Sequence, residues 1–166
     1  MAETMNRTVS SFEFRVRVRV NRQSLLTLIR RIAMSTFKRF EEIEAWKKAR
    51  ELTKRIYELS AKGAFAKDFG LKDQVRRAAV SVMSNIAEGY DRSGTGEFVQ
   101  FLATAKGSTA EVKCQLYVAL DQAYIDDDTF RDVSNLATET GKMVGGLMNY
   151  LRRSGIKGTK YKAQTV

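Results

Sequence analysis

Hydrophobic side chains recur at the period of an α-helix along most of the chain. Between 130 and 151 their spacing alternates between three and four residues, which predicts the buried stripe of a bundle helix. This stripe consists of Phe130, Val133, Ala137, Thr140, Val144, Leu147 and Leu151. A second stripe, on a helix expected from about 40 to 62, consists of Ile43, Trp46, Ala49, Thr53 and Ile56. Two further helices are expected from about 71 to 88 and from about 95 to 123.

Short connections separate the four segments. A turn is expected from Gly89 to Gly96, with Ser93 or Thr95 capping the following helix, and three aspartates at 126–128 open the last helix. The chain contains no proline, which agrees with long helices. Because short connections make neighbouring helices antiparallel, the sequence predicts an all-α, up-down-up-down four-helix bundle over residues 37–154.

Residues 1–36 do not follow this pattern and are expected to form an N-terminal extension. Hydrophobic and polar residues alternate from 12 to 20, which fits a strand or an extended arm. The following LLTLIRRIAM fits an amphipathic helix or a targeting element. We favour a third interpretation, in which the native protein starts at Met34 and the preceding residues lie upstream of it.

The charge of the chain is strongly positive. Its net charge of +10 and isoelectric point near 9.9 favour a polyanionic partner, above all nucleic acid. Arg76 follows Lys72 by four residues, so these two cations repel each other, whereas Arg77 has Asp73 four residues before it. A basic tail is expected at 155–166. The candidate nucleic-acid-binding residues are Lys72, Arg76, Arg77, Lys106, Lys113, Arg152 and Arg153.

The segment from Ala78 to Ala87 has no charged residue, although charged residues make up 29% of the chain. One side of this helix, with Ala79, Val82 and Ile86, can fill the bundle core. A second apolar side indicates a second burial surface, and another subunit is the economical partner. A loop or the N-terminal arm covering this side is the alternative. The candidate subunit-contact residues are Ala78, Val80, Met83 and Ala87.

Few residues of the chain are suited to catalysis or metal binding. There is no histidine, and the single cysteine, Cys114, has no base partner in the sequence pattern and is expected to be inert packing. The aspartates at 126–128 lack the spacing of a calcium loop. No apolar run is long enough to span a bilayer. We therefore expect a cytoplasmic protein with no enzymatic activity, no cofactor, no metal site and no membrane association.

Three motifs carry a family resemblance: AWKKARELTKRIYEL, FGLKDQVRRAAVSVMSNIAEGYDR and EFVQFLATAKGSTAEVKCQL. Together they resemble the bacterial four-helix bundle proteins first noticed in intervening sequences of large-subunit ribosomal RNA genes, whose relatives include the accessory protein of diversity-generating retroelements. The chain departs from the family pattern at Met83, where proline is usual, and at Gly141, Gly145 and Gly146 in the last helix. The resemblance covers about 37–151 and implies a cyclic homopentamer.

The resemblance also implies nucleic-acid or ribonucleoprotein partners, RNA more than DNA, and no settled activity. Combined with the charge, it predicts a non-catalytic, oligomeric binding module for nucleic acid or ribonucleoprotein. The alternative is a protein-interaction scaffold, such as an accessory subunit of a reverse transcriptase or a ribosome-associated protein.

Overall fold

A computed structural model of the protein describes residues 37–92 and 94–154. The expected N-terminal strand or arm, the proposed start at Met34 and the basic tail at 155–166 lie outside these residues. The described part contains α-helices and two short 3-10 helices and no strand, which confirms the all-α prediction. The elements are η1 (Phe40–Glu42), α2 (Glu44–Leu59), η2 (Phe65–Lys67), α3 (Phe69–Asp91), α4 (Thr95–Asp121) and α5 (Asp127–Ser154).

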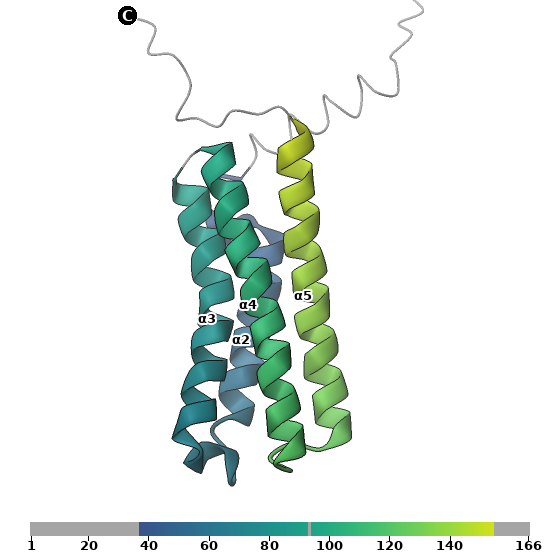
Figure 1. Cartoon of the computed structure of the whole chain (residues 1–166). Coiled ribbons are helices and arrows are strands. Elements are labelled where there is room, and N and C mark those ends of the chain that lie inside the picture. Colours follow the sequence, from purple (N-terminus) through teal and green to yellow (C-terminus); the bar gives the residue numbers. More distant parts are fainter. Residues whose placement is uncertain (1–36, 93, 155–166) are drawn as a thin grey trace, which may run out of the picture.

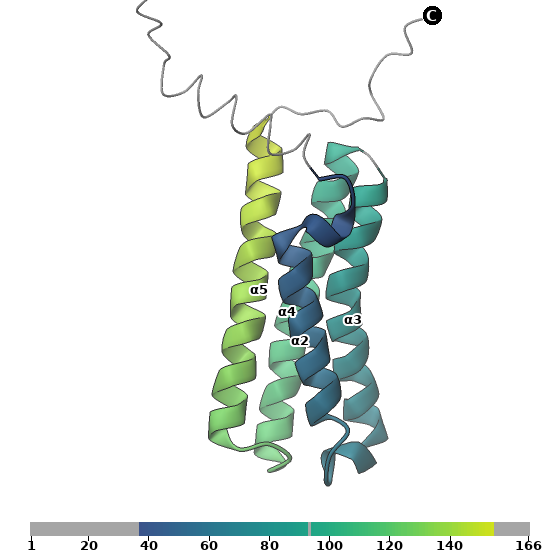
Figure 2. The same cartoon turned by 180° about the vertical axis from the view of Figure 1, so that it is seen from behind.

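The four α-helices lie side by side and alternate in direction (Figures 1 and 2). Each helix packs against the next in sequence, and α5 also packs against α2, so the bundle closes on itself. The start of the described chain and the end of α5 lie at one end of the bundle, whereas the α2–α3 and α4–α5 connections lie at the other (Figure 2). The Tyr90 hydroxyl donates a hydrogen bond of 2.6 Å to the Phe37 carbonyl and fastens the start of the described chain to α3.

The core consists of two clusters stacked along the bundle. The cluster nearer the α2–α3 connection contains Leu52, Ile56, Phe65, Val75, Leu116 and Val133 among others, and the second contains Ala49, Val82, Ile86, Leu102, Val144 and Leu151 among others. The expected stripe on α5 is confirmed at its five fully buried positions, Val133, Ala137, Thr140, Val144 and Leu151. Phe130 and Leu147 are only partly buried at its edges.

The connection between α3 and α4 lies within the expected turn from Gly89 to Gly96 but is shorter, because α3 continues to Asp91 and α4 begins at Thr95. Gly89 is a helical residue under two aromatic rings of α4: a Cβ there would lie 2.7 Å from atoms of both Phe98 and Phe101. The glycine is therefore required by close helix packing. Capping by Thr95 is wrong, since Thr95 is the first residue of α4 and Gly94 is the N-cap, without a side-chain hydrogen bond. The alternative cap, Ser93, lies outside the described residues.

The beginning of α5 agrees with the prediction for the aspartates. The Asp126 carboxylate accepts a hydrogen bond of 2.8 Å from the Thr129 amide, as an N-terminal cap does. Hydrogen bonds from Thr129 lower the pKa of Asp126 below its ordinary value. Close packing also explains Gly141, where a Cβ would lie 2.8 Å from the Thr109 hydroxyl oxygen.

Candidate nucleic-acid interface

Lys72 and Arg76 lie on the first turns of α3, beside the end of α2. The Lys72 ammonium donates a 2.8 Å hydrogen bond to the Ala66 carbonyl and lies 4.4 Å from the centre of the Phe69 ring. The Arg76 guanidinium lies 4.6 Å from the centre of the Tyr57 ring. Among the described residues neither cation forms an ion pair, so both positive charges remain uncompensated.

Two exposed aromatic rings accompany these cations. Phe69 is 74% exposed and Tyr57 is 44% exposed. We call Tyr57, Phe69, Lys72 and Arg76 the aromatic–cation surface. The sequence analysis did not identify the two aromatic residues as part of a site. Phe69 nevertheless falls outside the core stripe of α3 and immediately follows the N-cap Asp68.

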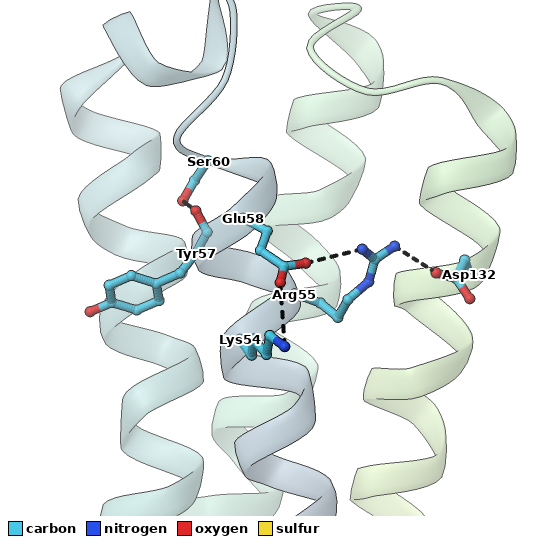
Figure 3. Close-up of polar contacts among 6 residues, drawn as sticks. All are labelled: Lys54, Arg55, Tyr57, Glu58, Ser60 and Asp132. Carbon is cyan, nitrogen blue, oxygen red and sulfur yellow. Dashed lines mark hydrogen bonds and ion pairs between the residues drawn. The ribbon is translucent and has the colours of Figure 1, made fainter.

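The orientation of Arg76 depends on a residue of the preceding helix end. Its Nε donates a 2.7 Å hydrogen bond to the hydroxyl of Ser60, and Ser60 is fully buried. Figure 3 shows Ser60 beside the backbone of Tyr57, to whose carbonyl its hydroxyl donates at 3.5 Å. A buried anchor therefore holds the guanidinium over the ring, which limits the rotamers available to this cation.

The carboxylates near the aromatic–cation surface already have partners. Asp68 caps α3 through the Leu71 amide at 2.9 Å and accepts a hydrogen bond of 3.4 Å from the Tyr124 hydroxyl. Asp73 pairs with Arg77 at 3.1 Å, which confirms the expected neutralisation of Arg77. The local field is consequently set by the unpaired cations.

The opposite side of α2 has a different character. There Arg55 bridges Glu58 at 3.2 Å and Asp132 of α5 at 3.0 Å, pointing away from the Tyr57 ring (Figure 3). Lys48 likewise bridges Glu51 at 3.0 Å and Glu139 of α5 at 3.4 Å. A groove of about 480 Å³ between α2 and α5 is lined by these side chains other than Glu58. Because the charges compensate one another, this groove is a poor site for a polyanion.

The remaining candidate cations do not join the aromatic–cation surface. Lys106 and Lys113 lie on α4, the first exposed beside Gly145 and the second half-buried. Arg152 and Arg153 are exposed on the last turn of α5, at the opposite end of the bundle (Figure 1). The seven predicted residues therefore form several separate positive regions rather than one patch.

The predicted subunit-contact set is partly wrong. Ala78 is 2% exposed and belongs to the core cluster, because α3 packs against both α2 and α4 and this widens its buried arc. Val80 is 39% exposed, whereas Met83 and Ala87 are half-buried. Ala79, Val82 and Ile86 are fully buried, as expected.

Two polar residues within the uncharged segment from Ala78 to Ala87 form hydrogen bonds, which offsets the cost of burying their polar groups. Asn85 donates to the Ser81 carbonyl at 2.7 Å, and the hydroxyls of Ser81 and Ser108 lie 2.9 Å apart across α3 and α4. Ser84 is exposed instead. Cys114 is also exposed, so its expected role as inert packing is wrong.

Other kinds of site find little support in the described part of the chain. No group of three or more His, Cys, Asp or Glu residues is placed to hold a metal ion among residues 37–92 and 94–154. None of the described helices combines the length and apolar content that crossing a bilayer requires.

Comparisons with known proteins agree with the fold and with the resemblance of the motifs. A solved protein of the S23 ribosomal protein family from Bacteroides thetaiotaomicron is similar over 63% of this chain and 97% of that chain, with a TM-score of 0.57 and 22% identity. At this identity the likeness shows the fold alone. Comparison with curated proteins finds no match. The family model of the 23S rRNA-intervening sequence protein matches residues 41–146, more than half of the chain, and the chain therefore belongs to this family.

Proposed function

We propose that the protein is a non-catalytic binding module for nucleic acid or ribonucleoprotein, with RNA preferred over DNA, and that it acts as a homo-oligomer. One observation carries this proposal: Lys72 and Arg76 are held at the surface without a carboxylate partner in the described part of the chain. The net charge of +10 and the family's description as a 23S rRNA-intervening sequence protein support it.

Phosphate contacts account for this kind of binding. Each lysine or arginine that neutralises a phosphate releases condensed counterions, so affinity falls as salt rises. Such contacts position the nucleic acid without reading its bases. Two cations bind weakly, but an assembly that repeats them multiplies the contacts that one strand can make. The cyclic homopentamer implied by the family resemblance would provide five copies of the surface.

Subunit contacts are proposed along the uncharged part of α3. Val80, Met83 and Ala87 follow Arg76 at helical spacings of four, three and four residues, so they continue the same side of the helix. They leave apolar surface that a neighbouring subunit can bury. Ala78 takes no part, because it is already buried within one chain.

A double substitution tests the nucleic-acid function. Lys72→Glu with Arg76→Glu should weaken binding to unrelated RNA and DNA, and should flatten the slope of log affinity against log salt by close to one unit per lost phosphate contact. The matched control is Lys47→Glu with Lys54→Glu, since these cations already lie 2.7 Å and 3.9 Å from Glu44 and Glu58. Equal affinity and slope in the Lys72/Arg76 variant and the wild type would contradict the proposal.

A protein-interaction scaffold is the second candidate, and the exposure of Phe69 favours it because large apolar side chains are common in protein interfaces. In this function the basic surface meets an acidic face of a protein, such as a reverse transcriptase or a ribosomal component. Capture of a purified reverse transcriptase that is abolished in the Lys72/Arg76 variant, with no change in nucleic-acid affinity, would establish the scaffold instead.

A further inference from the structure

We propose that the aromatic–cation surface binds unpaired nucleotides, with Phe69 stacking on a base and Lys72 contacting the phosphate beside it. This inference rests on the proposed nucleic-acid function and specifies its ligand as single-stranded RNA. It depends on the placement of two aromatic rings under two cations, which phosphate binding alone does not require.

Phe69 is the most exposed large hydrophobic residue of the described chain, at 74%. The Lys72 ammonium lies 4.4 Å from its ring centre, yet most of the side chain remains open to solvent. An aromatic face of this kind accepts any base, because every base has a π-face. The ammonium beside the ring is then placed to meet the negative charge of the same nucleotide.

Tyr57 and Arg76 form a second pair, close to the first along α3. The guanidinium is stacked 4.6 Å from the Tyr57 ring centre and held by the buried Ser60 hydroxyl. A fixed guanidinium plane can stack on a base with its free face and donate its remaining N–H groups to phosphate. Two stacking positions near each other suit a strand whose successive bases are splayed apart.

The charges around the surface favour an anionic strand over an apolar protein segment. Residues 60–77 contain five lysines or arginines and two aspartates. Both aspartates have partners, Asp68 in the cap of α3 and Asp73 in the pair with Arg77. The α3 cap is therefore occupied by a carboxylate, and phosphate contact falls to the side chains of Lys72 and Arg76.

Unpaired RNA is expected rather than a duplex. Bases inside a duplex are stacked on each other, so an exposed ring can reach only the sugar–phosphate backbone. A duplex would use the cations and leave Phe69 without a role. Preference for single strands that depends on Phe69 therefore separates this inference from electrostatic binding in general.

The test uses fluorescence anisotropy with the full chain and three labelled probes: a short oligouridine, the same backbone carrying abasic nucleotides, and a blunt RNA duplex. Phe69→Ala should weaken oligouridine binding by roughly 5- to 150-fold, the range for loss of one stacked base. Its affinity for the abasic and duplex probes should not change. Phe69→Trp should restore oligouridine binding, because it restores a stacking face.

The matched control is Tyr117→Ala. Tyr117 is 54% exposed and packs against Phe130, and no cation from residues 37–92 or 94–154 lies over its ring, so its loss should leave all three affinities unchanged. Wild-type protein that binds none of the probes would contradict the proposed function itself. Three results would overturn the stacking inference alone: equal wild-type affinity for all probes, unchanged oligouridine binding in Phe69→Ala, or altered oligomeric mass in that variant.

Discussion

One side of α3 changes character halfway along the helix. Its first part carries Phe69, Lys72 and Arg76, with cations that lie against aromatic rings and a backbone carbonyl. Its second part carries Val80, Met83 and Ala87, within the uncharged segment from Ala78 to Ala87. The first part is compatible with solvent or an anionic ligand, whereas the second gains stability only from an apolar partner. One helix side can therefore serve two different contacts in succession.

The largest effect is expected from a charge placed in the uncharged part. Ala87→Glu should abolish assembly, because an unpaired carboxylate buried between subunits costs more than the contact gains. Light scattering should fall to the monomer mass of 18.8 kDa, with circular dichroism still showing helix. Arg76→Glu, one charge reversal in the other part, should keep the wild-type mass. A wild type that is already monomeric at micromolar concentration would refute assembly.

A smaller effect is expected from overpacking the core side of α3. Ala78→Leu should lower the free energy of unfolding by about 1–3 kcal/mol, because the pocket around Ala78 is closed. Val80→Leu, two residues away and 39% exposed, should change it by no more than about 0.5 kcal/mol. Both are best measured by urea denaturation in the Ala87→Glu background. If Ala78→Leu and Val80→Leu changed the free energy of unfolding equally, Ala78 would lie on the outer side of α3 and not in the core.

The next effect in size is expected from the guanidinium of Arg76, in the charged part of α3. Arg76→Ala removes a hydrogen bond to Ser60 and a contact with the Tyr57 ring, and should destabilise the protein by about 1–2 kcal/mol. Combining it with Tyr57→Ala should cost less than the sum of the two single changes. Strict additivity in thermal denaturation would show that the ring contact contributes nothing.

The smallest effect concerns Tyr90, which follows the uncharged part on the same side of α3. Burial and, to a smaller extent, nearby carboxylates raise the pKa of the Tyr90 hydroxyl above the ordinary value of 10.0. The stabilising contribution of this hydroxyl is therefore fully present below pH 10 and is lost as pH rises through the raised value. Tyr90→Phe should cost about 0.5–1 kcal/mol at pH 7 through the lost bond to Phe37. The difference from wild type should shrink above pH 10. A constant difference would contradict the raised pKa.

Periodicity was sufficient to predict the architecture. Alternating spacings of three and four residues depend only on the sequence of one helix. The burial of Val133, Ala137 and Val144 could therefore be predicted without knowledge of the neighbouring helices. The pairing of Arg77 with Asp73 was predictable for the same reason, because both partners lie four residues apart on one helix.

The errors arose where a neighbouring helix decides the outcome. Ala78 is buried because α3 has two packing partners, which one helical pattern cannot reveal. Gly89 resembles a turn residue in the sequence because the need for a glycine there comes from aromatic rings of α4, which the sequence around Gly89 does not show. The contact between Arg76 and Tyr57 joins residues 19 apart in sequence, so no local rule could have placed a ring beneath that cation.

The position of the aromatic–cation surface also has a practical consequence. The start of the described chain and the end of α5 lie at the far end of the bundle. The length of α3, 23 residues or roughly 34 Å, separates that end from Phe69, the first residue of α3. A dye or affinity handle coupled at that far end would stay clear of any strand bound to the surface. Immobilised through such a handle, the protein would present Phe69 and Lys72 to solution, so the proposed binding of single-stranded RNA could be measured on a surface.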